Sequence, residues 1–160
     1  MNSIETNDST PTDEHTRPSL SRSTVATGLE AGAFATVVMT VFREPTARAL
    51  PPTAELLARW LGGDADDYHL HSLGLHLVYG AIAGGLFAPI LAVIDADRTH
   101  PEAVGLVVGG VYGLVLSVFG EAVVLQRYLD MDLATDESAV FHAGHLIYGL
   151  ALGAWLGSRA

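Results

Sequence analysis

The 160-residue chain contains no cysteine, so disulfides, zinc–thiolate sites and iron–sulfur clusters held by thiolates are excluded. It also contains no lysine. Its eight basic residues are all arginine, against eighteen acidic residues and a net charge of −10. The absence of a basic patch excludes nucleic acid as an expected partner. Abundant carboxylates without lysine indicate a halophilic archaeon, with codon bias in a GC-rich genome as the alternative explanation.

Long apolar runs are the dominant feature of the chain. Each run is about as long as a helix that crosses the hydrocarbon core of a bilayer. None has the polar face that a helix of a soluble bundle would show. The sequence therefore predicts an all-α integral membrane bundle of four transmembrane helices within residues 23–160, a multi-pass protein of the cell membrane with the lipid bilayer around it. The predicted spans are residues 24–44, 72–94, 103–125 and 139–157.

Two polar segments accompany the predicted spans. Residues 1–22 are acidic and rich in Ser and Thr, which predicts a disordered tail. We expect no signal peptide there, because no basic start leads into an apolar core. After the first span, PPTAELLARWLG at 51–62 predicts a short amphipathic helix that lies at the membrane interface, with Trp60 at the level of the head groups.

A ten-residue motif occurs twice, as HLVYGAIAGG at 76–85 and HLIYGLALGA at 145–154. These two copies lie 69 residues apart. In the preceding spans, Gly28 and Gly32 align with Gly109 and Gly113, 81 residues apart, and Thr36 then aligns with Ser117. The pattern predicts a duplicated helical hairpin whose halves are related by an axis along the membrane normal.

Glycines recur at every fourth position of the apolar runs. Such spacing puts small residues on one stripe of a helix, where two backbones can approach closely in lipid. The stripes predict tight helix packing, and they suggest a homo-oligomer or a membrane partner subunit. The glycines assigned to packing are Gly28, Gly32, Gly80, Gly84, Gly109, Gly113, Gly149 and Gly153.

Four ionisable residues inside the spans are the candidate site, because such groups are costly in lipid. His76, Glu121, His142 and His145 are expected at similar depth near the same membrane face. A structural polar cluster is the favoured interpretation. The alternatives are a zinc or iron site, a haem held by two of the histidines, and a proton or ion path through Glu121.

Catalytic motifs are missing from the sequence. It has no GxSxG, no HExxH and no phosphate-binding glycine loop before a lysine. We therefore expect a protein that is not an enzyme, with no catalytic residue and no cofactor unless the divalent-metal or haem alternative holds. The favoured function is helix packing and assembly, or an accessory role in the membrane. The other alternative is a small ion or proton carrier.

Four segments carry a family resemblance: GLEAGAFATVVMTVFREP at 28–45, PPTAELLARWLG at 51–62, HLVYGAIAGGLF at 76–87 and FHAGHLIYGLALG at 141–153. They resemble a family of small four-helix membrane proteins common in haloarchaea and bacteria, and more loosely the YagU-type inner-membrane proteins. The resemblance implies a fold, a membrane location and cytoplasmic termini, and it implies no reaction. Arginines divide equally between the two sides, so the positive-inside rule does not set the orientation.

Overall fold

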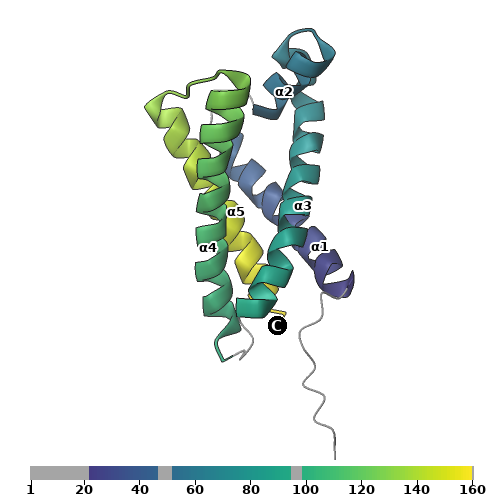
Figure 1. Cartoon of the computed structure of the whole chain (residues 1–160), viewed down its shortest axis with the longest axis vertical. Coiled ribbons are helices and arrows are strands. Elements are labelled where there is room, and N and C mark those ends of the chain that lie inside the picture. The colour runs from purple at the N-terminus through teal and green to yellow at the C-terminus, as the bar shows by residue number, and fades with distance from the viewer. Residues whose placement is uncertain (1–21, 47–51, 95–98, 160) are drawn as a thin grey trace, which may run out of the picture.

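The computed structural model describes residues 22–46, 52–94 and 99–159. All of the predicted tail except Arg22, the first residue of α1, lies outside these residues. The secondary structure within them is helical (Figure 1). The elements are α1 (Arg22–Arg43), α2 (Pro52–Leu61), the 3-10 helix η1 (Ala65–Tyr68), α3 (His69–Ile94), α4 (Pro101–Phe119), the π-helix η2 (Gly120–Leu129) and α5 (Thr135–Gly157).

Four helices of the described chain are long and apolar enough to cross a membrane: α1, η1 with α3, α4 with η2, and α5. The prediction of an all-α fold with four such helices is confirmed. Their outward surfaces are also apolar; Val107, Val111 and Val115, for example, lie exposed along α4. Extended apolar surface of this kind suits lipid rather than water and suggests a multi-pass membrane protein.

The third and fourth long helices extend beyond their predicted spans. η2 continues α4 to Leu129 and α5 begins at Thr135, four residues beyond the predicted end of one span and four before the predicted start of the next. The loop between these helices covers only residues 130–134. Leu125 and Leu129 are buried against Phe141, and this packing keeps the chain helical through the polar residues Gln126 and Arg127. His142 therefore lies about two turns inside α5 and not at its start.

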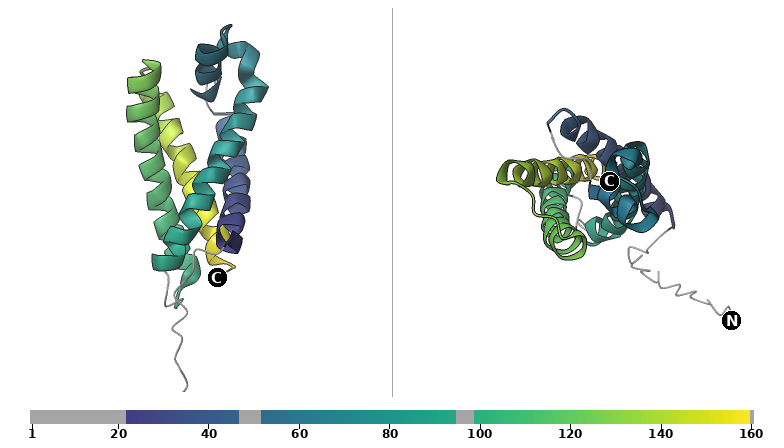
Figure 2. Two further views of the ribbon diagram at one scale, coloured as in Figure 1. Left: turned by 45° about the vertical axis from the view of Figure 1, so that its right-hand side comes forward. Right: turned by 90° about the horizontal axis from the view of Figure 1, so that it is seen from above.

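The four long helices form two tight pairs, α1 with α3 and α4 with α5. α1 also packs along α5, whereas α3 and α4 make few contacts. Figure 2 shows the pairs close together at the end that carries the C-terminus and apart at the end that carries α2. The core between them consists of Ala31, Ala35, Met39, Ala83, Phe87, Leu91, Tyr148 and Leu152.

Within the first pair, glycine lets the backbones of α1 and α3 touch. A Cβ atom added to Gly32 would overlap the carbonyl oxygen of Gly80 and the Cα of Gly84. A Cβ atom on Gly28 would likewise meet the carbonyl oxygen of Gly84. All eight glycines assigned to packing lie at the two intrachain crossings, so their stripes are occupied within the chain.

The crossing of α4 and α5 repeats these contacts with a different register from the predicted one. Gly109 meets the carbonyl oxygen of Gly149 and the Cα of Gly153, as Gly32 meets Gly80 and Gly84 in the first pair. In these contacts Gly32 matches Gly109, 77 residues later, one helical turn away from the Gly113 of the predicted alignment. The sequence allowed both alignments because glycine recurs every fourth residue in α4.

Two tyrosines join the helix pairs. Tyr148 of α5 donates a hydrogen bond to the carbonyl oxygen of Gly80 at 2.7 Å, and Tyr112 of α4 donates one to the carbonyl oxygen of Ala83 at 2.8 Å. Both acceptors belong to α3. Tyr79, which occupies the position of Tyr148 in the other copy of the ten-residue motif, is instead 42% exposed and lies at the open end of the bundle.

Candidate functional site

A cavity of about 240 Å³ lies where the two helix pairs diverge. α3 and η2 form its two sides, α5 forms its floor and α2 lies over it. The lining is mostly apolar, and none of the described residues that form it is Asp, Glu, Lys or Arg. The polar side chains that line it are Thr53, Trp60, His76, Tyr79 and His145.

The short helix α2 is tied to both sides of this cavity. Thr53 donates a hydrogen bond from Oγ1 to the carbonyl oxygen of Ser72 in α3, at 3.1 Å. At the other end of α2, Trp60 donates from Nε1 to the Tyr128 hydroxyl of η2, at 2.9 Å. The Arg59 guanidinium lies 5.4 Å from the centre of the Tyr128 ring. α2 therefore spans the gap between α3 and η2 and leaves the cavity bounded above.

Three side chains that line the cavity retain hydrogen-bonding capacity. His145 bonds through Nδ1 to the carbonyl oxygen of Phe141 at 2.9 Å. A carbonyl can only accept, so Nδ1 carries the hydrogen and Nε2 of the neutral ring remains an acceptor. Within the part of the chain that the structure describes, the side chains of His76 and Tyr79 form no hydrogen bond; their rings lie 6.4 Å apart.

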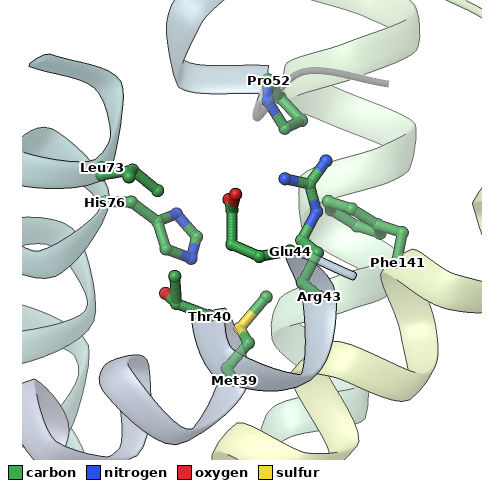
Figure 3. Close-up of a pocket in the computed structure, with 8 residues that line it drawn as sticks. All are labelled: Met39, Thr40, Arg43, Glu44, Pro52, Leu73, His76 and Phe141. Carbon is green, nitrogen blue, oxygen red and sulfur yellow. The ribbon is translucent and has the colours of Figure 1, made fainter. Parts of the chain in front are cut away.

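A second, smaller cavity of about 20 Å³ lies on the other side of His76. Figure 3 shows the His76 ring of α3 on one side of it, and the Arg43 guanidinium and the Glu44 carboxylate rising from the end of α1 on the other. Glu44 is also 3.7 Å from Nε2 of His69. His76 therefore separates a group of charged side chains at the end of the bundle from the larger apolar cavity.

Glu121 and His142 form a separate polar cluster between η2, α4 and α5. Oε2 of Glu121 is 2.7 Å from Nε2 of His142. Ser138 donates a hydrogen bond to Oε1 of Glu121 at 2.9 Å. On the other side of the imidazole, Nδ1 of His142 lies 2.8 Å from Oγ of Ser117. Every polar atom of the carboxylate–imidazole pair thus has a partner.

Ser117 has one hydroxyl hydrogen and two acceptors within reach. One is Nδ1 of His142 at 2.8 Å, and the other is the carbonyl oxygen of Leu114, also at 2.8 Å. When the hydroxyl donates to Leu114, Nδ1 of His142 donates to the Ser117 oxygen. When the hydroxyl turns to His142, Nδ1 accepts. Ser117 can therefore complete the cluster with either tautomer of the imidazole.

The four predicted site residues lie at the same end of the bundle but divide into two groups. Glu121 and His142 are paired, whereas His76 and His145 line the cavity.

Across residues 22–46, 52–94 and 99–159, no three His, Asp or Glu side chains gather as a metal ion would require. Below the cavity, Phe87 and Leu152 are fully buried, so an ion path would have to cross an apolar layer.

Two further residues of the cavity, Tyr79 and Trp60, are not among the predicted site residues. Both line the cavity. Trp60 is also 60% exposed, and its predicted place at the level of the head groups stays a prediction. No pattern in the sequence distinguishes Tyr79 from Tyr148, which occupies the same position in the second copy of the motif.

The comparison with known proteins finds no relative of this chain. No protein-family model matches the chain, and no curated protein or solved structure matches it. The resemblance to the small four-helix membrane proteins stays a prediction.

The coupling between Glu121 and His142 can be measured by a double-mutant cycle with Glu121→Gln and His142→Phe. We expect each change to lower the free energy of unfolding by about 1–2 kcal/mol, with a coupling of about 1 kcal/mol, because His142 is 36% exposed and partly screened. Denaturation in mixed detergent micelles, followed by tryptophan fluorescence, gives these values.

The pair Glu44 and His69 provides the control for this cycle. Its atoms are 3.7 Å apart and both side chains are about two-fifths exposed, at 41% and 39%. A cycle with Glu44→Gln and His69→Phe is expected to show coupling near zero. Equal coupling in the two cycles would contradict the account of a partly buried, fully bonded cluster.

Proposed function

We propose that this chain is a non-enzymatic membrane protein that holds a small hydrophobic molecule taken from the bilayer. The cavity between α3 and η2 carries the proposal. Its lining is apolar, its polar groups are few, and three of them have unused hydrogen-bonding capacity. Such a combination is typical of sites for small ligands.

The position of the cavity supports entry from the lipid. Tyr79 lies ten residues into α3, which places it about 15 Å along the helix. Tyr79 of α3 and Val124 of η2 line the cavity on its two sides, and Tyr79 is 42% exposed. In a membrane, this side of the bundle would face hydrocarbon, so an apolar molecule could enter without crossing water.

An assembly role based on the glycine stripes receives less support. The eight glycines pack against each other, or against Thr36, within one chain. A partner subunit would therefore need another face of the bundle. An accessory role remains compatible with this proposal, because a protein that holds a membrane-soluble molecule can present it to others.

We further infer that the bundle is a duplicated helical hairpin and that α2 lies at the membrane interface. The matching contacts of Gly32 and Gly109 support the duplication. The exposed apolar side chains of Trp60 and Leu61, beside Arg59, support an interfacial α2. In this arrangement, α2 would cover the cavity from the water side.

The proposal is tested by filling the cavity. Val124 lines it, and Val115 lies 59% exposed on α4 away from it. We expect the organic extract of the purified wild-type protein and of Val115→Trp to contain one small hydrophobic molecule in near-equal amount to the protein, and the extract of Val124→Trp to lack it. Chromatography with mass spectrometry makes the comparison. The same profile from all three proteins would overturn the proposal.

A further inference from the structure

The hydrogen-bonding groups of the cavity narrow the class of ligand, and the following inference rests on the proposed function above. Tyr79 offers a hydroxyl donor, and His145 offers Nε2 as an acceptor. His76 offers one donor and one acceptor when neutral. A complementary ligand must therefore both accept and donate hydrogen bonds. Alternatively, it exists in two forms, one that accepts hydrogen bonds and one that donates them.

The described lining of the cavity argues against a charged head group. Among residues 22–46, 52–94 and 99–159, no Asp, Glu, Lys or Arg lines the cavity. A phosphate or carboxylate would need cationic or multiple donor partners, and a buried charge without them is costly. The ligand's polar part is therefore neutral, which argues against the head group of a phospholipid.

The size and walls of the cavity favour a flat ring. A volume of about 240 Å³ lies below the range of roughly 300–1,000 Å³ that drug-sized ligands occupy, so the cavity suits one or two rings. Trp60 and Phe141 provide aromatic surfaces beside the polar groups. The gap between α3 and η2 then gives an apolar tail a route into the lipid.

We propose that the cavity binds the ring of a membrane-soluble quinone or its quinol. The two carbonyl oxygens of a quinone accept hydrogen bonds, which Tyr79 and His76 can donate. The hydroxyl groups of a quinol donate, and Nε2 of His145 can accept. A neutral planar ring with an apolar tail meets each constraint set by the charge, volume and side opening of the cavity.

The two tryptophans of the chain provide the assay. Trp60 lines the cavity, whereas Trp155 is near the other end of the bundle beside Phe34 and Arg159. A Trp155→Phe protein leaves Trp60 as the reporter, and a Trp60→Phe protein is the control. Both proteins are titrated with a short-chain alkyl benzoquinone. We expect the fluorescence of Trp60 to be quenched to saturation. The fluorescence of Trp155 should fall only in proportion to the quinone concentration in the micelle.

The role of the polar groups is tested by Tyr79→Phe in the Trp155→Phe background. Tyr79 has no hydrogen bond to lose within the described chain, so the fold is expected to be unchanged, and circular dichroism checks this. We expect the quinone affinity to fall about three- to tenfold. An alkylbenzene with the same chain, which has no oxygens, is expected to displace the quinone poorly.

The outcomes separate this inference from the proposed function. One outcome would overturn the quinone class and leave an apolar binding site. In that outcome Tyr79→Phe does not change the saturable quenching, and the alkylbenzene competes as well as the quinone. A phospholipid as the extracted molecule would also overturn it while the binding function stands. No saturable quenching by quinone or quinol, together with an empty organic extract, would overturn both.

Discussion

Replacing Gly84 by alanine is expected to lower the free energy of unfolding by about 3 kcal/mol, the upper end of the range for overpacked interiors. The added methyl group would overlap the carbonyl oxygen of Gly28 and the backbone of Gly32. Because these are backbone atoms, no side chain can move aside, and α1 and α3 must separate. Unfolding of the detergent-solubilised protein by a denaturing detergent, followed by tryptophan fluorescence, measures the loss.

Gly74 provides the matched control in the same helix. A Cβ atom added there meets nothing within 4 Å. Alanine also forms helix better than glycine by up to about 1 kcal/mol, so Gly74→Ala is expected to leave the stability unchanged or to raise it. Destabilisation of similar size in both variants would contradict the close crossing of α1 and α3.

Replacing Phe87 by alanine is expected to have the second large effect on stability. The Phe87 side chain is fully buried, and its ring centre lies 4.8 Å from that of Tyr112 across the two helix pairs. Truncation of such a side chain costs about 3–5 kcal/mol in soluble proteins. In lipid the loss is one of packing rather than of burial from water, so we expect a value of about 3 kcal/mol.

The neighbouring residue Leu86 tests which face of α3 meets lipid. Its side chain is 63% exposed. Leu86→Ala is expected to change the free energy of unfolding by less than about 1 kcal/mol, because the removed atoms contact lipid or detergent in the folded state. If Leu86→Ala were as destabilising as Phe87→Ala, the exposed face of α3 would be covered by protein, and the bundle would be part of a larger assembly.

The membrane-type helices could be predicted from sequence because lipid imposes a simple requirement. Runs of about twenty apolar residues with few charges occur four times, and the structure has four helices that fit this description. The ends were less predictable. The segment from Leu125 to Leu129 remains helical because these two leucines find a partner in Phe141, a contact between helices that no local pattern reveals.

The register of the repeat depended on information that the sequence does not contain. Glycine at 105, 109 and 113 allows α4 to be aligned with α1 in two ways, and only the contacts with Gly149 and Gly153 select one. The cavity was unpredictable for a related reason. The ten-residue motif occurs in both α3 and α5, but α1 packs along α5 while α3 and α4 diverge, and this asymmetry opens the space beside Tyr79.

The candidate site was predicted in composition but not in arrangement. His76, Glu121, His142 and His145 lie at one end of the bundle, as topology required. Their division into a bonded pair and two cavity residues follows from the directions of α5 and η2, where Glu121 meets His142 and Ser138 while His145 turns to the cavity. Periodicity along one helix does not reveal which neighbouring helix each face meets.

A crystal structure of the protein grown from a lipid mesophase would test the central claim most directly. The account predicts that α3 and η2 stand apart, with α2 over them. Non-protein density should fill the space between Tyr79, Val124 and His145. A structure in which the side chains of Tyr79 and Val124 pack against each other and close the cavity, with no such density, would contradict the account.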